Sequence, residues 1–453
     1  MARGKKKTAV LSPEQRLQQA LVSVEEQPYK VPENWCWTYV GAISILVGGG
    51  TPNKSNPKYW NGDIPWASVK DVKGDYLYTT LDSITHEGLE NSAANLCDVD
   101  DLILVTRIEP AKTIVATIVS AINQDLKILK SPLSSVFLHY YFKNFRHWFE
   151  MKSSGSTVKG ITVANIQNTH FPLPPLPEQQ RIVDRIESLF AKLDEAKEKV
   201  QAVVDGFEDR KAAILHKAFT GELTAKWRVK NNVNNVHWKK LWFDECVDKM
   251  QNGISKRKGD IGEPYVVLRL ANLSDEDFDE NDLREILLDE KERNNYQLKS
   301  DDVLMIRVNG SKENVGKLYR ITNQKQWAFC DHIIRIRYTS NIMPQYMVFF
   351  SKTKIYRQYI KDNMVSSAGQ NTISRKGMAK LRIPIPKKDE QEQIVAILEN
   401  IFEKEQQAKE AAEQVIDQID VMKKSILARA FRGDLGTNDP NDESAVEFLK
   451  SVL

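Results

Sequence analysis

Two stretches of the chain carry apolar residues at alternating intervals of three and four residues. In the first stretch these positions are Ile182, Ile186, Leu189, Leu193, Val200, Val203 and Phe207. In the second they are Ile394, Leu398, Ile401, Val415, Ile419, Met422 and Ile426, with Glu405 as an interruption. This spacing places a narrow apolar stripe along a helix and is typical of a coiled-coil seam. The pattern predicts two long helices that pack against each other.

The two helices belong to an internal repeat. Residues 171–223 align without a gap with residues 383–435 at roughly 40% identity, far above chance for unrelated segments. Each copy enters its helix through a proline-rich run, PLPPLPEQQRIV or IPIPKKDEQEQIV, and ends at Gly221 or Gly433. Proline fixes the entry of a helix, and glycine favours a left-handed cap at its end. Each helix should hold about 40 residues and measure roughly 60 Å.

The sequence ahead of each helix is a divergent unit of mixed character. Short β-branched segments such as DLILVTRI and HIIRIRY predict strands, whereas SSVFLHYYFKNFRHWFEM and QYMVFFSKTKIYRQYIK predict helices. We therefore expect an α+β fold, with two domains separated by two long antiparallel coiled-coil helices in a pseudo-twofold internal repeat. The expected boundaries are 1–30 for a basic extension and short helix, 31–175 for the first domain, 176–222 for the central helix, 223–385 for the second domain, 386–433 for the C-terminal helix and 434–453 for an acidic tail.

The arrangement of the two helices has one alternative. Each helix could lie on the surface of its own domain, but a narrow stripe packs poorly against a broad sheet, which favours the paired arrangement. An antiparallel pair would hold the domains at opposite ends. The SPEQRLQQALV helix and the acidic tail either pack beside one another or bind partners.

Composition narrows the class of protein. A chain of 453 residues is long enough for two or more domains. No apolar run approaches the about 20 residues that cross a bilayer, and MARGKKKTAV lacks a secretory signal, so we expect a soluble, cytoplasmic protein without membrane association. Four scattered cysteines favour buried thiols over disulfides or a zinc site. The net charge of +3, from 64 basic and 61 acidic residues, does not by itself indicate nucleic acid.

The loops between the expected strands are rich in basic, amide and aromatic residues. TPNKSNPKYWNGDIPWASVKD lies in the first half, and ISKRKGD and RVNGSKENVGK lie in the second. Such side chains supply phosphate contacts and forked hydrogen bonds to base edges. Loops of this composition are also common on solvated surfaces, so the loops alone leave DNA binding open.

Several segments resemble catalytic motifs but depart from them. NPKY (56–59) lacks the second proline of the amino-methyltransferase motif NPPY, and GSKENVGKL (310–318) is one residue too long for a phosphate-binding loop. CDH (330–332) places adjacent strand residues on opposite faces, which favours a buried thiol over a nucleophile pair. GGG (48–50) is either a turn that allows close backbone approach or a simple bend. The sequence predicts neither a catalytic site nor a metal site.

With these motifs in view, the whole chain resembles the DNA-specificity subunit of type I restriction-modification enzymes. The segments that carry the resemblance are PYKVPENWCW (28–37), GGGTPNKSNPKYWNGDIPWASVKD (48–71), GSTVKGIT (155–162), PLPPLPEQQRIV with its helix to AFTGEL (172–223), RVNGS (307–311), GQNTIS (369–374) and the second helix to AFRGDLG. The resemblance implies two target-recognition domains, over 31–175 and 223–385, each reading one half of a split DNA target. It also implies that the two helices dock methyltransferase subunits.

The resemblance further implies a division of labour. Two methyltransferase (modification) subunits would bind S-adenosylmethionine and methylate adenine, and two motor-nuclease (restriction) subunits would use ATP and magnesium. This chain would bind no cofactor, carry no catalysis and recognise double-stranded DNA. A rod of roughly 60 Å spans about 18 base pairs and would set the two domains in successive major grooves.

The resemblance and the loop composition together give the expected DNA contacts. In the first domain they are Lys54, Lys58, Tyr59, Trp60 and Lys70. In the second they are Ser255, Lys256, Arg257, Arg307, Asn309, Ser311 and Lys317, with Gln370 and Asn371 near the helix entrance. For each residue the alternative is an ordinary solvent-exposed loop position.

Other classes of protein stay open at this point. A fused restriction-methylation system uses similar readers and differs in its partner proteins. A stand-alone methyltransferase or endonuclease is disfavoured because the cofactor and phosphate-binding motifs are missing. A pure coiled-coil scaffold would show no preference among DNA sequences.

Overall fold

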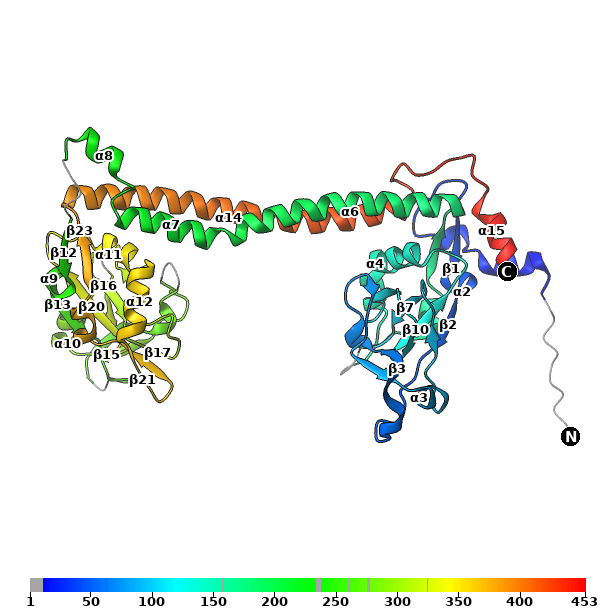
Figure 1. The fold of residues 1–453 in the computed structure, drawn as a ribbon, viewed down its shortest axis with the longest axis horizontal. Helices are drawn as coiled ribbons and strands as arrows, with labels where there is room; N and C mark the ends of the chain where they lie inside the picture. Colours follow the sequence, from blue (N-terminus) through cyan, green and yellow to red (C-terminus); the bar gives the residue numbers. More distant parts are fainter. Residues whose placement is uncertain (1–10, 156–158, 234–237, 260, 275–277, 324) are drawn as a thin grey trace. The chain divides into compact units, whose positions relative to one another are not determined.

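The computed structural model describes residues 11–155, 159–233, 238–259, 261–274, 278–323 and 325–453 (Figure 1). The chain forms two compact units: unit 1 holds residues 1–199 and 415–453, and unit 2 holds residues 200–414. Each unit therefore combines one domain with parts of both long helices. No helix in the described part of the chain is both long and apolar enough to span a membrane.

The first domain is built on two sheets. The larger sheet has the order β2 (Ile45–Gly48), β10 (Leu126–Lys130), β7 (Leu102–Val105), β8 (Thr113–Ala116) and β4 (Tyr76–Leu77). The smaller has the order β5 (Asp82–Ile84), β3 (Trp60–Ala67), β9 (Ser120–Ile122) and β6 (Leu96–Cys97). All four residues of β7 are buried because alternate side chains enter different apolar clusters on the two faces of the sheet. This burial explains the unbroken apolar run LILV.

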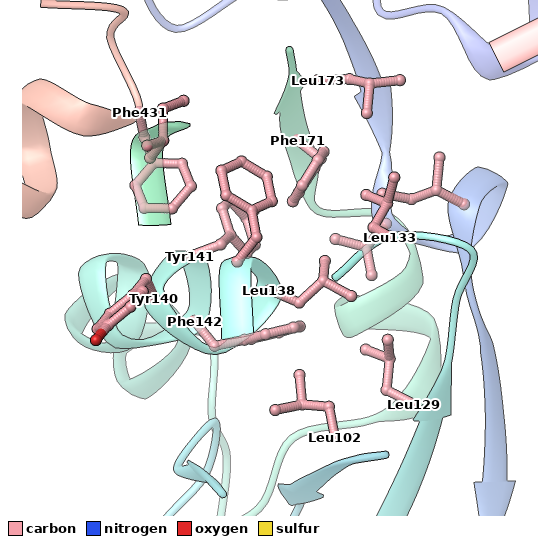
Figure 2. Close-up of a cluster of buried hydrophobic side chains, with 14 of the residues drawn as sticks. Leu102, Leu129, Leu133, Leu138, Tyr140, Tyr141, Phe142, Phe171, Leu173 and Phe431 are labelled. Carbon is pink, nitrogen blue, oxygen red and sulfur yellow. The ribbon is translucent and has the colours of Figure 1, made fainter. Parts of the chain in front are cut away.

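Helix α4 (Ser135–Met151) covers one face of the larger sheet and fills the core of unit 1. Figure 2 shows its Tyr141 beside Phe171 and Phe431, with ring centroids 4.6 Å and 5.7 Å away. Phe431 directly follows α14 (Lys388–Ala430), so the end of the C-terminal helix is anchored in the first domain. The Ser134 hydroxyl caps the start of α4 by accepting from the Phe137 amide.

The second domain repeats the framework of the first. Its main sheet has the order β13 (Val247–Asn252), β20 (Ile333–Tyr338), β16 (Val303–Ile306) and β18 (Leu318–Arg320), which matches β2, β10, β7 and β8. Its smaller sheet has the order β15 (Glu285–Leu288), β14 (Glu263–Leu268) and β19 (Trp327–Phe329). The β14 and β19 strands pair in parallel, as β3 and β9 do. The internal repeat therefore includes the two divergent units.

Two further elements of the second domain take the position of α4. Helices α11 (Pro344–Ser351) and α12 (Lys354–Asn363) lie beside the main sheet (Figure 1), and their buried aromatic residues belong to the core cluster of the second domain. Phe219, at the end of α7 (Phe207–Phe219), packs on Tyr346 and Phe350 with ring centroids 5.0 Å and 5.2 Å away. In the sequence repeat Phe219 aligns with Phe431, which explains why both copies keep Ala-Phe before glycine.

A short strand pair leads into each long helix. In unit 1, β1 (Cys36–Tyr39) pairs antiparallel with β11 (His170–Leu173). In unit 2, β12 (Lys239–Trp242) pairs antiparallel with β23 (Arg382–Ile385). Both pairs are two-stranded, so Pro172 and Pro384 lie in edge strands, which tolerate a missing donor.

The glutamate of the repeated Pro-x-x-x-Glu-Gln segment is buried at the start of each helix. Glu178 accepts hydrogen bonds from Trp35 Nε1 (2.7 Å) and Asn438 Nδ2 (2.8 Å). Glu390 accepts from Trp238 Nε1 (3.1 Å) and Thr224 Oγ1 (2.7 Å). In each unit, therefore, the segment that follows the end of one helix meets the glutamate that begins the other.

The central helix is interrupted, which corrects the single helix predicted over 176–222. It forms α6 (Leu176–Asp205) and α7, with Gly206 between them. Glycine lowers helix propensity, and the apolar pattern gave no sign of this break because it continues through Phe207. The predicted caps are confirmed: Gly221 and Gly433 have φ of +83° and +80°.

Within each unit the two helices run antiparallel. In unit 1, Lys197 Nζ lies 2.7 Å from Asp420 Oδ1, and Lys423 pairs with Asp194. In unit 2, Arg210 Nε lies 3.2 Å from Glu405 Oε2. Positions rise along one helix as they fall along the other, which confirms the predicted antiparallel direction. Glu405, the interruption of the apolar stripe, thus serves as an ion-pair partner.

The burial of the predicted seam residues varies along the helices. Ile182, Ile186, Phe207, Ile394, Leu398 and Ile419 are buried. Leu189, Leu193, Val200, Ile401 and Ile426 are half-buried. Val203, Val415 and Met422 are 50%, 40% and 49% exposed, so the prediction that these three lie in a continuous seam is wrong.

The apolar stripe of each helix packs against a domain at its start and against the other helix farther along. This change of partner accounts for the varying burial of the seam residues. Ile182 and Ile186 belong to the core of the first domain, and Ile394 and Leu398 belong to the core of the second. The start of each helix therefore packs on its own domain, as the alternative reading expected. Farther along, polar and small residues are more frequent, and ion pairs between the helices accompany the buried Phe207 and Ile419.

The first and the last helix of the described residues pack together in unit 1. Ala20 of α1 (Pro13–Ala20) shares a core cluster with Ala445 and Leu449 of α15 (Ala445–Val452). The Arg16 guanidinium also donates to the carbonyl of Leu453. We expected these two segments either to pack beside each other or to bind partners, and the structure shows that they pack beside each other.

Candidate nucleic-acid interface

Several of the predicted DNA-contacting residues of the second domain come together from distant parts of the chain. Strand β17 (Val308–Asn309) pairs with β22 (Gln370–Thr372), which pairs in turn with β21 (Val365–Ser367). The Arg257 guanidinium lies 3.0 Å from Asp331, and the Arg307 amide donates to His332 (2.8 Å). We call segments 255–257, 307–311, 331–332 and 365–371 the second loop cluster.

A glycine just ahead of segment 255–257, and another in the first domain, each allow two parts of the backbone to approach closely. A Cβ on Gly253 would lie 2.2 Å from the Cys330 carbonyl oxygen, and a Cβ on Gly49 would lie 2.1 Å from the Asn123 carbonyl oxygen. Both distances are too short for any side chain. In the GGG turn, Gly49 thus allows close approach to the backbone of this same chain, and the predicted close approach to a binding partner stays a prediction.

A tight hairpin forms one side of the second loop cluster. Ser367 pairs with Gln370, leaving a two-residue turn in which Ala368 and Gly369 both have positive φ, +48° and +76°. Positive φ at both turn residues defines the type I′ turn that suits a β-hairpin. Val365, 69% exposed, and Gln370, also exposed, therefore lie on a rigid projecting element.

The predicted residues of the second domain divide by role. Ser255, Arg257, Ser311 and Gln370 are exposed, and Arg307, Asn309 and Lys317 are half-buried. Lys256 Nζ is held by Glu292 Oε2 at 2.6 Å. Asn371 is only 5% exposed, and its amide nitrogen donates to the Gly310 carbonyl (2.9 Å). Asn371 thus joins the hairpin to segment 307–311, which corrects its prediction as a reading residue.

Four of the predicted residues of the first domain lie in one loop at the start of β3, namely Lys54, Lys58, Tyr59 and Trp60, whereas Lys70 lies in the η3 turn (Val69–Asp71) that follows the end of β3. Lys54, Lys58 and Lys70 are exposed, and none of them forms an ion pair with a described residue. The Trp60 ring meets Trp66 edge-on at 5.2 Å, and its Nε1 donates to Asn53 (3.3 Å). Tyr59 is half-buried at the end of the η2 turn (Pro57–Tyr59). The loop therefore presents the ammonium groups of Lys54 and Lys58, which pair with no described carboxylate, beside the indole ring of Trp60, which its contacts hold in place.

The structure adds a segment of the first domain that sequence reasoning missed. Arg107 forms an isolated bridge with Gly160, and the Ile108 amide donates to the Lys159 carbonyl (2.9 Å). We call segments 51–54, 106–109, 124–125 and 159–160 the first loop cluster. The similar runs VDDLILVTR (99–107) and SDDVLMIRV (300–308) carried the signal, since the last two residues of the second run begin the RVNGS segment (307–311). The motif at 155–162 falls partly outside the described residues, at 156–158.

The side chains of Cys330, Asp331 and His332 converge, with their possible ligand atoms all within 4.8 Å of one another, so the prediction that they point to opposite faces is wrong. Burial raises the pKa of the Cys330 thiol, which disfavours the thiolate needed for attack or metal binding. The Asp331 carboxylate is paired with Arg257 and lies 3.3 Å from the His332 ring. A metal cation bound to Asp331 would compete with the guanidinium of Arg257. The Cys330 thiol is buried, as predicted.

Two domains of one framework, each with its own cluster of exposed polar loops, define a class of protein that binds through two separate surfaces. The sequence profile described as "Type I restriction modification DNA specificity domain" matches residues 32–204 and 265–416. The chain is 28% identical over 421 residues to the type I restriction enzyme StySPI specificity subunit of Salmonella potsdam, covering 90% of each chain. It is 26% identical over 424 residues to the EcoKI specificity subunit of Escherichia coli K12, again covering 90% of each.

Solved structures share the fold. A chain from a study of complex assembly and conformational transition of the type I R-M system matches with a TM-score of 0.67 at 19% identity, over 90% of this chain and 100% of that one. The HsdS subunit from Thermoanaerobacter tengcongensis matches with a TM-score of 0.61 at 18% identity, over 91% and 100%.

The chain belongs to the family of type I restriction-modification DNA specificity domains. Its function is DNA sequence recognition within a type I restriction-modification complex, and it is a non-catalytic specificity subunit. Subunits of this kind bind DNA and partner subunits.

Proposed function

We propose that this chain reads a two-part DNA target, one part with each loop cluster, and holds modification subunits along its long helices. The observation that carries the proposal is the repeat itself. The two domains keep the same strand order and the same parallel pairing, yet their loops differ in sequence and chemistry. One framework with two different binding edges suits two different short sequences.

The chemistry of the loop clusters suits DNA. Exposed lysines such as Lys54 and Lys58 match the phosphate backbone, which supplies affinity and orientation but little sequence information. Amide and hydroxyl groups, including Gln370 and Ser311, can form hydrogen bonds to base edges. Their support by Asn371 and the type I′ turn limits the entropy lost on binding.

The partners follow from the family. We propose double-stranded DNA, two methyltransferase subunits and two motor-nuclease subunits, with S-adenosylmethionine on the former and ATP and magnesium on the latter. The exposed apolar residues along the helices, including Val203, Val415 and Met422, fit a role in docking such subunits better than a role in a seam. The complex would act on DNA in the cytoplasm.

Mapping of adenine methylation tests the proposal. The chain and its modification subunit would be produced together in a host without this methylation, and methylated adenines would be mapped by sequencing. We expect one motif made of two specified parts separated by unspecified bases. Cells that produce the modification subunit alone are the control. A single uninterrupted motif, or methylation that does not require this chain, would contradict the proposal.

A further inference from the structure

An exposed isoleucine in the first loop cluster has a rare backbone conformation. Ile108 has a φ of +77°, and its side chain is 57% exposed. Left-handed backbone is a genuine outlier for a β-branched residue, because Cβ and its two branches crowd the main chain. Because the Ile108 side chain is exposed, the fold also lacks the favourable free energy that burial of this apolar side chain would supply. Such outliers gather at functional sites, where the surrounding structure enforces them.

The surroundings of Ile108 hold this conformation in place. On one side its amide donates to the Lys159 carbonyl at 2.9 Å. On the other, the Ala111 amide donates to the Val105 carbonyl at 2.9 Å, which ties the loop to the end of β7. Ile108 belongs to none of the core clusters of the described chain. The loop therefore fixes an apolar side chain in solvent.

The second domain presents different chemistry at the same position of the framework. In the first domain the Ile161 amide donates to the Thr106 carbonyl (2.9 Å). In the second, the Ile373 amide donates to the Arg307 carbonyl (3.0 Å). The residue two positions after the accepting carbonyl is Ile108 in the first domain and Asn309 in the second. A position where the framework is kept and the side-chain chemistry changes is suited to setting specificity.

We propose that Ile108 is a specificity-determining residue that contacts the C5 methyl group of a thymine in the major groove. The proposal rests on the DNA recognition proposed above. Apolar side chains distinguish thymine by its methyl group, which no other base carries. The neighbouring exposed cations, Arg107, which lies 3.3 Å from Asp125, and Lys159, suit the adjacent phosphates.

Replacing the thymine methyl group by hydrogen tests the contact from the DNA side. Affinity of the complex with its modification subunit would be measured for the mapped target, with deoxyuridine replacing each thymine of the first-domain half in turn. Loss of one buried methyl group should weaken wild-type binding about fourfold at one position. The Ile108→Gly variant should bind the thymine and uracil duplexes equally, with a melting temperature no lower than that of the wild type, because glycine accepts positive φ.

Two variants serve as controls. Asp100→Gly also changes an exposed residue with positive φ, +68°, but at the opposite end of β7, so it should keep the preference for thymine. Ile108→Val keeps two methyl groups at the tip and should keep most of the preference.

The outcomes separate the inference from the function on which it rests. A wild-type complex without any preferred target would refute the proposed function. A defined target whose first half lacks thymine, or tolerates uracil throughout, would refute the role of Ile108 alone. An Ile108→Gly variant that melts lower and still prefers thymine would show a structural role and overturn the inference.

Discussion

At the scale of single residues, two buried glutamates tie the ends of the helices to the domains. Glu178 and Glu390 are each almost completely buried, and each accepts a tryptophan indole hydrogen bond together with others. A buried donor left without its acceptor costs its full desolvation free energy. Each glutamate therefore stabilises three converging segments: the strand pair, the start of its own helix and the segment after the other helix.

Replacing Glu178 by alanine should lower the free energy of unfolding by about 3 kcal/mol, because the indole of Trp35 and the amide of Asn438 lose their acceptor in a buried site. Glu178→Gln keeps an acceptor and should cost less. Denaturant unfolding would measure both. Glu198→Ala, at an exposed position of the same helix, is the control and should change stability by less than about 0.5 kcal/mol. Equal losses for Glu178→Ala and the control would contradict this role.

A second residue gives the first domain a dependence on pH. The His139 ring (3.1 Å) and the Lys143 ammonium (2.7 Å) hold the pKa of Asp75 well below its ordinary value. A carboxylate whose pKa is lowered by folding adds stability above its unfolded pKa, and that stability is lost as the pH falls.

Asp75→Asn should therefore be less stable than the wild type at neutral pH, and its free energy of unfolding should fall less steeply between about pH 5 and pH 2. Denaturant unfolding at a series of pH values measures the slope. Asp82→Asn, at an exposed aspartate, is the matched control. Parallel curves for Asp75→Asn and the wild type would show that this ion pair does not contribute.

At the scale of elements, glycine has opposite effects at the two ends of α7. Gly206 has φ of −75°, which any residue adopts, and the one contact of an added Cβ that is too short is with Arg210 Nη1 at 2.7 Å, the far end of a flexible side chain. Gly221 has φ of +83°. Gly206→Ala should raise the free energy of unfolding by up to about 1 kcal/mol, and Gly221→Ala should lower it by about 1 kcal/mol or more. Thermal unfolding of the pair tests this, and a change of the same sign in both variants would contradict it.

The long helices and their caps could be predicted because their determinants are local. Apolar spacing, the entry prolines and the final glycines all lie close in sequence. The break at Gly206 was missed because a stripe does not record weak helix propensity. The exposure of Val203 and Met422 was missed because apolar spacing does not show which surface packs against the apolar face of a helix. Pattern predicts which face of a helix is apolar and leaves open what covers it.

The loop clusters could be predicted only in part. Segments 255–257 and 307–311 had the right composition, but their meeting depends on sheet pairing between distant residues. Asn371 resembled a reading residue in sequence, and only its burial shows that its amide is used within the fold. Ile108 carried no chemical signal in sequence, since its significance lies in its φ and exposure.

At the scale of the whole molecule, the duplication explains the division of the chain. The end of α14, a helix that begins in unit 2, completes unit 1 by bringing Phe431 to the core of the first domain, and Phe219 at the end of α7 packs in the core of the second domain. Unit 1 is therefore assembled from two separate segments of the chain, whereas unit 2 is one continuous segment. Exchange of a domain should respect these junctions and leave both helices intact.

The central claim is that each domain reads its own part of the target. Residues 31–175 would be replaced by the corresponding domain of the StySPI relative, and adenine methylation would be mapped for the hybrid with its modification subunit. We predict that the part read by the first domain changes while the other part and the spacing stay as in the wild type. A change in both parts, or in neither, would contradict the account.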